Sequence, residues 1–201
     1  MSDISGLNEA RLYDGDTYVA DYTEAWQQAH KADLPEPENS GVVISEQPFA
    51  DIKSFHLKND NQVKYWGVNL EKNKSLFASG EKDCECVFQS AKFKKKGWLL
   101  LLELKYCKDE ERNLTDNLDK AVKQVTQTYQ TLVSSKIVDS KQLRVYCNIA
   151  VPPSSREPFT SFLTTQDAEK KLHDESKIHL LGFNEVLILN EGYIKPPKIA
   201  V

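Results

Sequence analysis

The sequence predicts an α/β protein built around a central mixed β-sheet with helices packed against it, and three observations support this class. Three strand-like segments follow one another at residues 62–70, 84–90 and 97–106. An amphipathic helix follows at about 114–133, and after it comes an apolar strand at 143–151. Strands joined by short turns pair antiparallel, whereas a strand reached through a helix pairs parallel by a right-handed crossover. The order of elements therefore predicts an α/β sandwich.

The first 47 residues are expected to form an acidic N-terminal extension to a main α/β domain that spans 48–201. Apolar side chains at helical spacing predict a helix between Asp16 and Lys31. The stretch 34–41, which is rich in proline and glutamate, ends this helix as a turn or linker.

Turn signals separate the strands in the first half of the chain. Residues 62–70 alternate in part between polar and apolar side chains, and a turn at 72–74 leads into a return that begins at 75–78. A lysine-rich turn at 92–96 joins the next two strands. Its lysines either lie in solvent or contact phosphate, and the sequence supports both interpretations equally.

The long helix is the clearest element, because its apolar residues mostly lie three and four positions apart. These residues are Leu114, Leu118, Ala121, Val122, Val125, Tyr129, Leu132 and Val133. The strand 143–151 follows and is stopped by Pro152-Pro153. A weaker helix over 159–173 and two short strands at 177–181 and 185–189 complete the predicted pattern.

Composition indicates an ordinary globular protein. Hydrophobic residues make up 40% of the chain and charged residues 28%, and no apolar run approaches the roughly 20 residues that span a membrane. No secretory signal is visible at the N-terminus, so a cytoplasmic location is expected. The four cysteines lack the paired spacing of a zinc site and are expected to be reduced and buried: Cys84, Cys86, Cys107 and Cys147.

The net charge of −4 is unevenly distributed along the chain. Residues 1–60 hold 4 Lys/Arg against 12 Asp/Glu, a balance of −8, whereas residues 61–201 hold 22 against 18, a balance of +4. The acidic charge is therefore confined to the N-terminal part. A mildly basic remainder is compatible with binding to nucleic acid, although the acidic total argues weakly against it.

Charged residues at the end of an apolar strand carry the main chemical signal. The run Trp98–Leu102 leads directly into Glu103-Leu104-Lys105. In a strand, Glu103 and Lys105 project from the same face, where burial of charge is costly unless it is paired or binds a metal. Glu85 supplies a second carboxylate from the preceding strand. These residues predict a divalent-metal site beside a lysine; the alternative is an exposed ion pair on a half-covered sheet.

This arrangement resembles the PD-(D/E)XK nuclease superfamily, which has the restriction-endonuclease-like fold. The matching residues are Glu85 on one strand and Glu103 with Lys105 at the end of the next, and the resemblance covers residues 60–190. The family usually has aspartate at the first acidic position, where this chain has Glu85; Asp83, on the same strand face, could replace or assist it. The resemblance implies a three-layer sandwich in which helices flank a central mixed β-sheet.

The resemblance also implies a set of roles for these residues. Mg²⁺ or Mn²⁺ would be held by Glu85, Glu103 and the carbonyl of Leu104. Lys105 would orient or help to deprotonate the attacking water, or stabilise charge on the phosphate. From the long helix, Gln124 would contact the phosphate or orient the site.

Some members of the superfamily add a glutamate from the first helix, and Glu24 is the candidate here. The expected function is a metal-dependent nuclease that hydrolyses phosphodiester bonds, with DNA favoured over RNA, in restriction, phage defence or repair. The expected partners are nucleic acid and a second copy of the chain or a larger assembly. One alternative is a catalytically degenerate nuclease-fold module that binds nucleic acid or a protein partner. Another gives the acidic N-terminal segment a role in masking the basic core.

Overall fold

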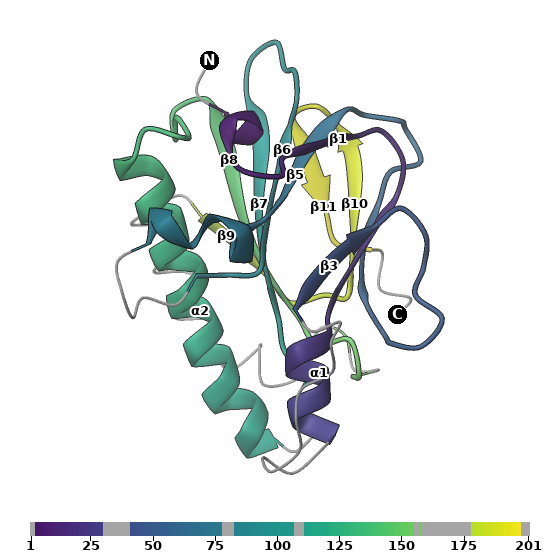
Figure 1. Cartoon of the computed structure of the whole chain (residues 1–201). Coiled ribbons are helices and arrows are strands. Elements are labelled where there is room, and N and C mark those ends of the chain that lie inside the picture. The colour runs from purple at the N-terminus through teal and green to yellow at the C-terminus, as the bar shows by residue number, and fades with distance from the viewer. Residues whose placement is uncertain are drawn as a thin grey trace.

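Two β-sheets and two α-helices make up the fold (Figure 1). The computed structural model describes residues 3–29, 41–77, 83–106, 111–154, 157 and 178–197. None of the helices in these ranges is long and apolar enough to cross a membrane.

The larger sheet has six strands in the order β1-β5-β6-β7-β8-β9. Their bounds are β1 (Arg11–Tyr13), β5 (Tyr65–Asn69), β6 (Cys86–Ser90), β7 (Gly97–Leu104), β8 (Leu143–Ala150) and β9 (Ile178–Leu181). From β1 to β7 neighbouring strands are antiparallel, whereas β7, β8 and β9 are parallel. The long helix α2 (Glu111–Ser134) connects β7 to β8, as the predicted parallel crossover requires.

The smaller sheet has five strands in the order β11-β10-β4-β2-β3. Their bounds are β2 (Thr17–Asp21), β3 (Val42–Ser45), β4 (Phe55–Lys58), β10 (Glu185–Asn190) and β11 (Tyr193–Lys195). The short helix α1 (Tyr22–Ala29) follows β2 directly. Two 3₁₀ helices, η1 (Ile4–Gly6) and η2 (Leu70–Leu76), flank the larger sheet.

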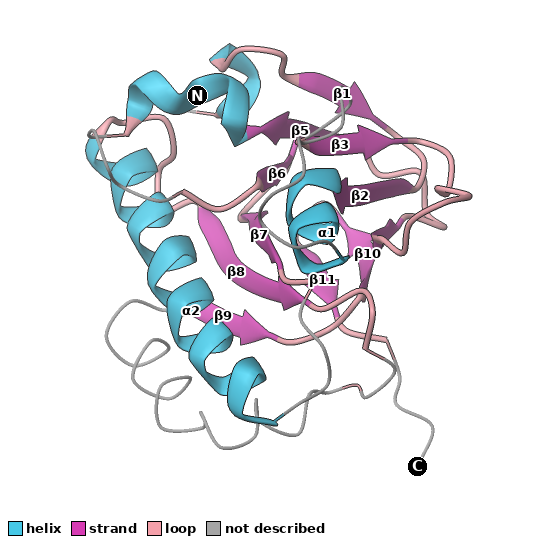
Figure 2. Ribbon diagram, turned by 60° about the horizontal axis from the view of Figure 1, so that its bottom comes forward, coloured by secondary structure: helices cyan, strands magenta, loops and turns pink. Residues whose placement is uncertain are grey.

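The two faces of the larger sheet bury different partners. Leu99 and Leu101 of β7 share a core with Val125 of α2, whereas Trp98 and Leu100 lie in a second core with residues of the smaller sheet. Because both faces are covered, β7 is apolar along most of its length rather than alternating. The described layers are therefore helix, sheet and sheet (Figure 2): the expected sandwich is present, but a sheet covers the face where a second helical layer was predicted.

The strands and the helix predicted between residues 62 and 151 are all present, with ends shifted by a few residues. Two predictions were wrong. Thr17–Asp21, expected to be helical, is strand β2, and residues 75–77 do not begin a strand, since η2 extends to Leu76 and is followed by its cap Phe77; residue 78 lies outside the described residues. The helix predicted over 159–173 lies outside the described residues.

Part of the predicted N-terminal extension lies inside the two sheets. β1 pairs with β5 in the larger sheet, and β2 pairs with β4 in the smaller one. Tyr13 and Val19 are buried in the core between the sheets. Deletion of residues 1–47 would therefore remove integral strands rather than release a separate masking arm.

Candidate active site

Glu103 and Lys105 lie side by side at the end of β7, as the sequence predicted. Leu104 pairs with Ala150, and the Lys105 N–H donates to the Ala150 carbonyl at 2.8 Å, so the backbone stays extended past the last strand residue. Both side chains therefore continue the face that Leu99 and Leu101 begin. The Lys105 Nζ lies 2.5 Å from Glu103 Oε1.

Glu85 reaches the same point from the neighbouring strand. Cys86 pairs with Leu102, and one further step in this register sets Glu85 opposite Glu103. Its carboxylate also accepts a hydrogen bond from the Leu104 N–H at 2.8 Å. The acid of the first motif is therefore attached directly to the strand that carries the second.

Two more carboxylates come from the junction of β2 and α1. Asp21 caps α1 by accepting a hydrogen bond from the Glu24 N–H at 3.0 Å. Glu24 Oε2 lies 3.8 Å from Lys105 Nζ, and the Tyr106 backbone N–H donates to the same carboxylate. Figure 1 shows α1 beside the end of β7 from which Lys105 extends.

The acidic side chains are spaced as metal ligands could be. One carboxylate oxygen from each of Asp21, Glu24 and Glu85 lies within 4.8 Å of the others. Neighbouring oxygens around an octahedral Mg²⁺ lie about 3 Å apart, because each bond is about 2.1 Å long. Side-chain movements of about an ångström would therefore bring all three to one cation.

Glu103 is the residue whose environment most clearly calls for a partner. Its carboxylate is 0% exposed, and neither oxygen makes a hydrogen bond of ordinary geometry within the described part of the chain. Buried polar atoms are normally hydrogen-bonded, and an ionised carboxylate is the most costly exception. The Lys105 ammonium compensates one oxygen only. The Glu85 carboxyl faces the same group, and Glu103 is not one of the three acids whose oxygens lie within 4.8 Å of one another, so its role as a metal ligand stays a prediction.

Burial raises the pKa of all four carboxyl groups of the site, those of Asp21, Glu24, Glu85 and Glu103. Burial, followed by the negative charge of Glu103, raises the pKa of Glu85 well above its usual range. Burial likewise raises the pKa of Glu103, and that of Glu24 to about 7, despite the opposing effect of Lys105. Burial also raises the pKa of Asp21. Among the described residues, four carboxyl groups thus share the Lys105 ammonium, so negative charge exceeds positive charge there when the acids ionise.

Lys105 is held in its charged form. Burial alone would lower its pKa, but the carboxylates of Glu103, Glu85 and Glu24 outweigh burial and raise it. An ammonium in this state donates hydrogen bonds and stabilises negative charge; it does not accept a proton. Of the roles predicted for Lys105, orientation of water and stabilisation of phosphate charge therefore suit this geometry better than proton abstraction.

The remaining predicted site residues lie close to the carboxylates but make other contacts. Gln124 Nε2 donates to the backbone carbonyl of Asp83 at 3.2 Å, two residues before Glu85. Asp83 itself is partly exposed, and burial raises its pKa. The Leu104 side chain is buried between the two sheets, and its N–H is used by Glu85. A metal contact from the Leu104 carbonyl stays a prediction.

The lysine-rich turn lies far from this site. Residues 92–96 connect β6 to β7 at the start of β7, whereas Glu103 lies near the opposite end of that strand. Seven residues of strand span about 23 Å. These lysines therefore do not line the carboxylate cluster of the same chain.

Sequence reasoning missed Asp21 as a site residue. Its signal was a capping pattern, Asp21-Tyr22-Thr23-Glu24, in which the first and fourth residues mark the start of a helix. The predicted helix began at Asp16, six residues before α1 does, which hid this pattern. The same error left Glu24 as an isolated candidate, whereas the structure brings Asp21 and Glu24 together with Glu85.

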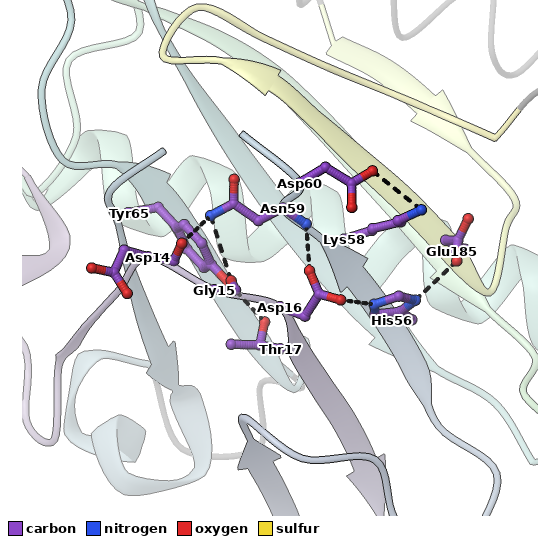
Figure 3. A network of polar contacts seen from close by, with 10 residues as sticks. All are labelled: Asp14, Gly15, Asp16, Thr17, His56, Lys58, Asn59, Asp60, Tyr65 and Glu185. Carbon is purple, nitrogen blue, oxygen red and sulfur yellow. Dashed lines mark hydrogen bonds and ion pairs between the residues drawn. The ribbon is translucent and has the colours of Figure 1, made fainter. Parts of the chain in front are cut away.

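A second polar cluster, the His56 network, lies at the other end of β2 (Figure 3). His56 Nε2 is 3.0 Å from Asp16 Oδ2, and Nδ1 is 2.9 Å from Glu185 Oε2. The ring stacks on Tyr18 at 4.5 Å, and the Asn59 N–H donates to the other Asp16 oxygen at 2.7 Å. The network therefore joins β2, β4 and β10 through satisfied hydrogen bonds.

The described cysteines are poor candidates for nucleophiles. Burial raises the thiol pKa of Cys84, Cys86 and Cys147, so the reactive thiolate is disfavoured. They are free and buried, as predicted, whereas Cys107 lies outside the described residues.

Comparisons of the chain with models of known protein families, with curated proteins and with solved structures found no match.

Proposed function

We propose that this protein is a metal-dependent nuclease of the PD-(D/E)XK type that hydrolyses phosphodiester bonds, with DNA as the favoured substrate. One observation carries the proposal: Glu103 is completely buried next to a charged Lys105, and within the described residues neither of its oxygens makes a hydrogen bond of ordinary geometry. Beside it, Asp21, Glu24 and Glu85 bring one carboxylate oxygen each to within 4.8 Å of the others. A divalent cation is the ligand that best suits a cluster of carboxylate oxygens such as this one.

The residues divide into two roles. Asp21, Glu24, Glu85 and Glu103 offer the hard oxygen atoms that Mg²⁺ or Mn²⁺ prefers. A divalent cation bound here would polarise a phosphate oxygen and lower the pKa of a coordinated water. Lys105 would orient that water through its N–H groups and stabilise the negative charge that develops on the phosphate.

The arrangement of elements around the site supports the same proposal. The two acidic strands, β6 and β7, form an antiparallel pair, and α2 carries the chain from β7 to the parallel strand β8. This is the order expected from the superfamily resemblance. Because one fold hosts many activities, the carboxylate geometry and not the topology carries the functional proposal.

A cleavage assay tests the proposal. The protein would be incubated with Mg²⁺ or Mn²⁺ and with single-stranded DNA, duplex DNA, branched DNA and RNA. Glu103→Gln and Lys105→Met should each lower the cleavage rate by at least about 10²-fold, since the first removes a carboxylate offered to the cation and the second removes the ammonium that stabilises transition-state charge. Matched controls are Glu191→Gln and Lys141→Met, which change exposed residues away from the site. Cleavage that survives both site substitutions would contradict the mechanism.

The second candidate is a non-cleaving nuclease-fold module that binds nucleic acid or a protein. It is favoured by the distance of the lysine-rich turn from the site, since the chain then brings little positive charge to a phosphate backbone there. Metal binding separates the two functions. A nuclease should bind Mn²⁺ through Glu85 and Glu103, whereas a degenerate module should bind nucleic acid or its partner equally well in a metal chelator.

A further inference from the structure

Glu85 occupies an irregular piece of chain just before a strand. Regular strand β6 begins only at Cys86, and residues 83–85 before it are not part of a ladder. The larger sheet holds this piece only at Glu85 itself, where the Leu70 N–H donates to the backbone carbonyl at 2.9 Å and the Leu104 N–H donates to the carboxylate at 2.8 Å. The backbone of residues 83 and 84, from which Glu85 extends, needs support from another element.

The further support comes from α2. The Cys84 N–H donates to Thr128 Oγ1 at 2.9 Å, and Gln124 Nε2 donates to the Asp83 carbonyl at 3.2 Å. Thr128 and Gln124 are one helical turn apart and therefore lie on the same face of α2. Two consecutive residues before Glu85 are thus attached to one helix.

The hydroxyl of Thr128 both donates and accepts a hydrogen bond. It donates its proton to the Gln124 carbonyl on its own helix at 2.9 Å, which leaves a lone pair directed at the Cys84 N–H. Thr128 is 0% exposed and Cys84 is 1% exposed, so water cannot replace either partner. Loss of the hydroxyl would leave a buried backbone N–H without a partner.

We infer that Thr128 is a positioning residue of the site: through the backbone of Cys84 it fixes the direction in which Glu85 presents its carboxylate to the cation. The inference rests on the proposed function of the same site. Gln124 assists at the Asp83 carbonyl, which gives it a role in orienting Glu85 rather than in contacting phosphate.

Helix α2 offers a matched control for this role. Thr126 makes the same kind of bond to its own helix, from Oγ1 to the Val122 carbonyl at 2.7 Å. No described residue outside α2 donates a hydrogen bond to the Thr126 hydroxyl, whereas the Cys84 N–H donates one to the Thr128 hydroxyl. Thr126→Val and Thr128→Val therefore make the same chemical change in the same helix; they differ in the contact with Cys84 and in burial, since Thr126 is partly exposed.

The test measures Mn²⁺ binding by titration calorimetry, with no substrate present. Thr128→Val should weaken Mn²⁺ affinity by about 10-fold or more, as expected when a group that orients a ligand is removed. Thr126→Val should leave affinity within about 2-fold of wild type, and Thr128→Ser, which restores the hydroxyl, should recover most of the loss. Equal Mn²⁺ affinities for Thr128→Val and Thr126→Val would overturn the inference.

A second measurement separates failure of this inference from failure of the proposed function. Amide hydrogen exchange of the metal-free protein should show faster exchange at Cys84 and Glu85 in Thr128→Val than in Thr126→Val. Unchanged exchange would overturn the role of Thr128 whatever the metal does. Absence of Mn²⁺ binding by the wild type would overturn the proposed function and, with it, the metal-directed part of this inference. If Thr128→Val does not fold, Gln124→Met provides the same comparison at the half-buried Asp83 contact.

Discussion

The two ends of strand β2 carry acidic clusters of opposite character. At one end, the pKa of Asp16 is lowered: burial alone would raise it, but hydrogen bonds from the Asn59 N–H and from His56 outweigh burial. At the other end, burial raises the pKa of Asp21, only five residues further along the chain. The same residue type on one strand is thus stabilised as an anion at one end and destabilised at the other.

Hydrogen-bond satisfaction accounts for the difference. In the His56 network, both ring nitrogens and both oxygens of Asp16 have partners (Figure 3). In the site, four carboxyl groups surround Lys105, and the buried carboxylate of Glu103 has no hydrogen bond within the described residues. A satisfied cluster contributes to stability, whereas an unsatisfied one costs stability and indicates a site that is completed by a ligand.

The largest expected effect is stabilisation by a divalent cation. At a Mn²⁺ concentration 100 times the dissociation constant, the free energy of unfolding of the wild type should rise by about 2.7 kcal/mol. Chemical denaturation with and without Mn²⁺ measures this difference. Glu103→Gln should lose most of it, whereas Glu191→Gln, an exposed glutamate in the turn between β10 and β11, should retain it. A full Mn²⁺ effect in Glu103→Gln would contradict the assignment of the unsatisfied cluster as the metal site.

The next effect concerns the satisfied cluster. His56→Phe keeps a ring that can stack on Tyr18 but removes the ring nitrogens that contact Asp16 and Glu185. The free energy of unfolding should fall by about 2 kcal/mol, because two carboxylates lose their partners. Urea denaturation at neutral pH measures the loss. The stabilisation by Mn²⁺ should be unchanged; if it disappears, the two ends of β2 are not independent.

A smaller effect of opposite sign is expected from Glu24→Gln. The pKa of Glu24 is raised to about 7, so its ionised form is less favourable in the folded than in the unfolded protein. Its contribution to stability is therefore lost as pH rises from its ordinary value towards 7. At pH 8 without metal, Glu24→Gln should gain about 1 kcal/mol, after allowance for partial exposure of the side chain.

The same change at Glu185 provides the contrast for this prediction. Glu185→Gln removes a carboxylate that His56 already satisfies, so the free energy of unfolding should fall rather than rise. Urea denaturation of both variants at pH 8 measures whether the free energy of unfolding rises or falls in each. A loss of stability in both would show that the carboxylates of the site are stabilising in the metal-free protein.

The smallest effect appears in acid. The pKa of Asp16 is lowered, so its contribution to stability is complete above its ordinary value of 3.8 and is lost as pH falls through its lower folded value. Asp16→Asn should therefore flatten the decline in the unfolding free energy between about pH 4 and pH 2. Thermal unfolding across this range measures it. An identical decline in wild type and Asp16→Asn would show that other groups control acid unfolding.

Much of the larger sheet and half of the candidate site follow from local sequence pattern. The apolar run before Glu103 predicts a strand that is covered on both faces, and the period of two sets Glu103 and Lys105 on one face. The apolar residues at helical spacing predict α2 and, through it, a parallel return. These features depend on neighbours in the chain, which is why periodicity reveals them.

Only the tertiary structure decided the rest. Val19 and Phe55 are buried against the larger sheet from strands too short for a clear alternation, so β2 and β4 left little local signal. Asp21 meets Glu85, and Thr128 meets Cys84, across more than 40 residues of chain. Such contacts are determined by how whole layers pack, because burial of apolar surface fixes where distant segments meet. The sequence by itself indicated Glu24, Glu85 and Glu103 as acids that could hold a cation; only the packing of β2 beside β7 added Asp21 and decided which of them face one another.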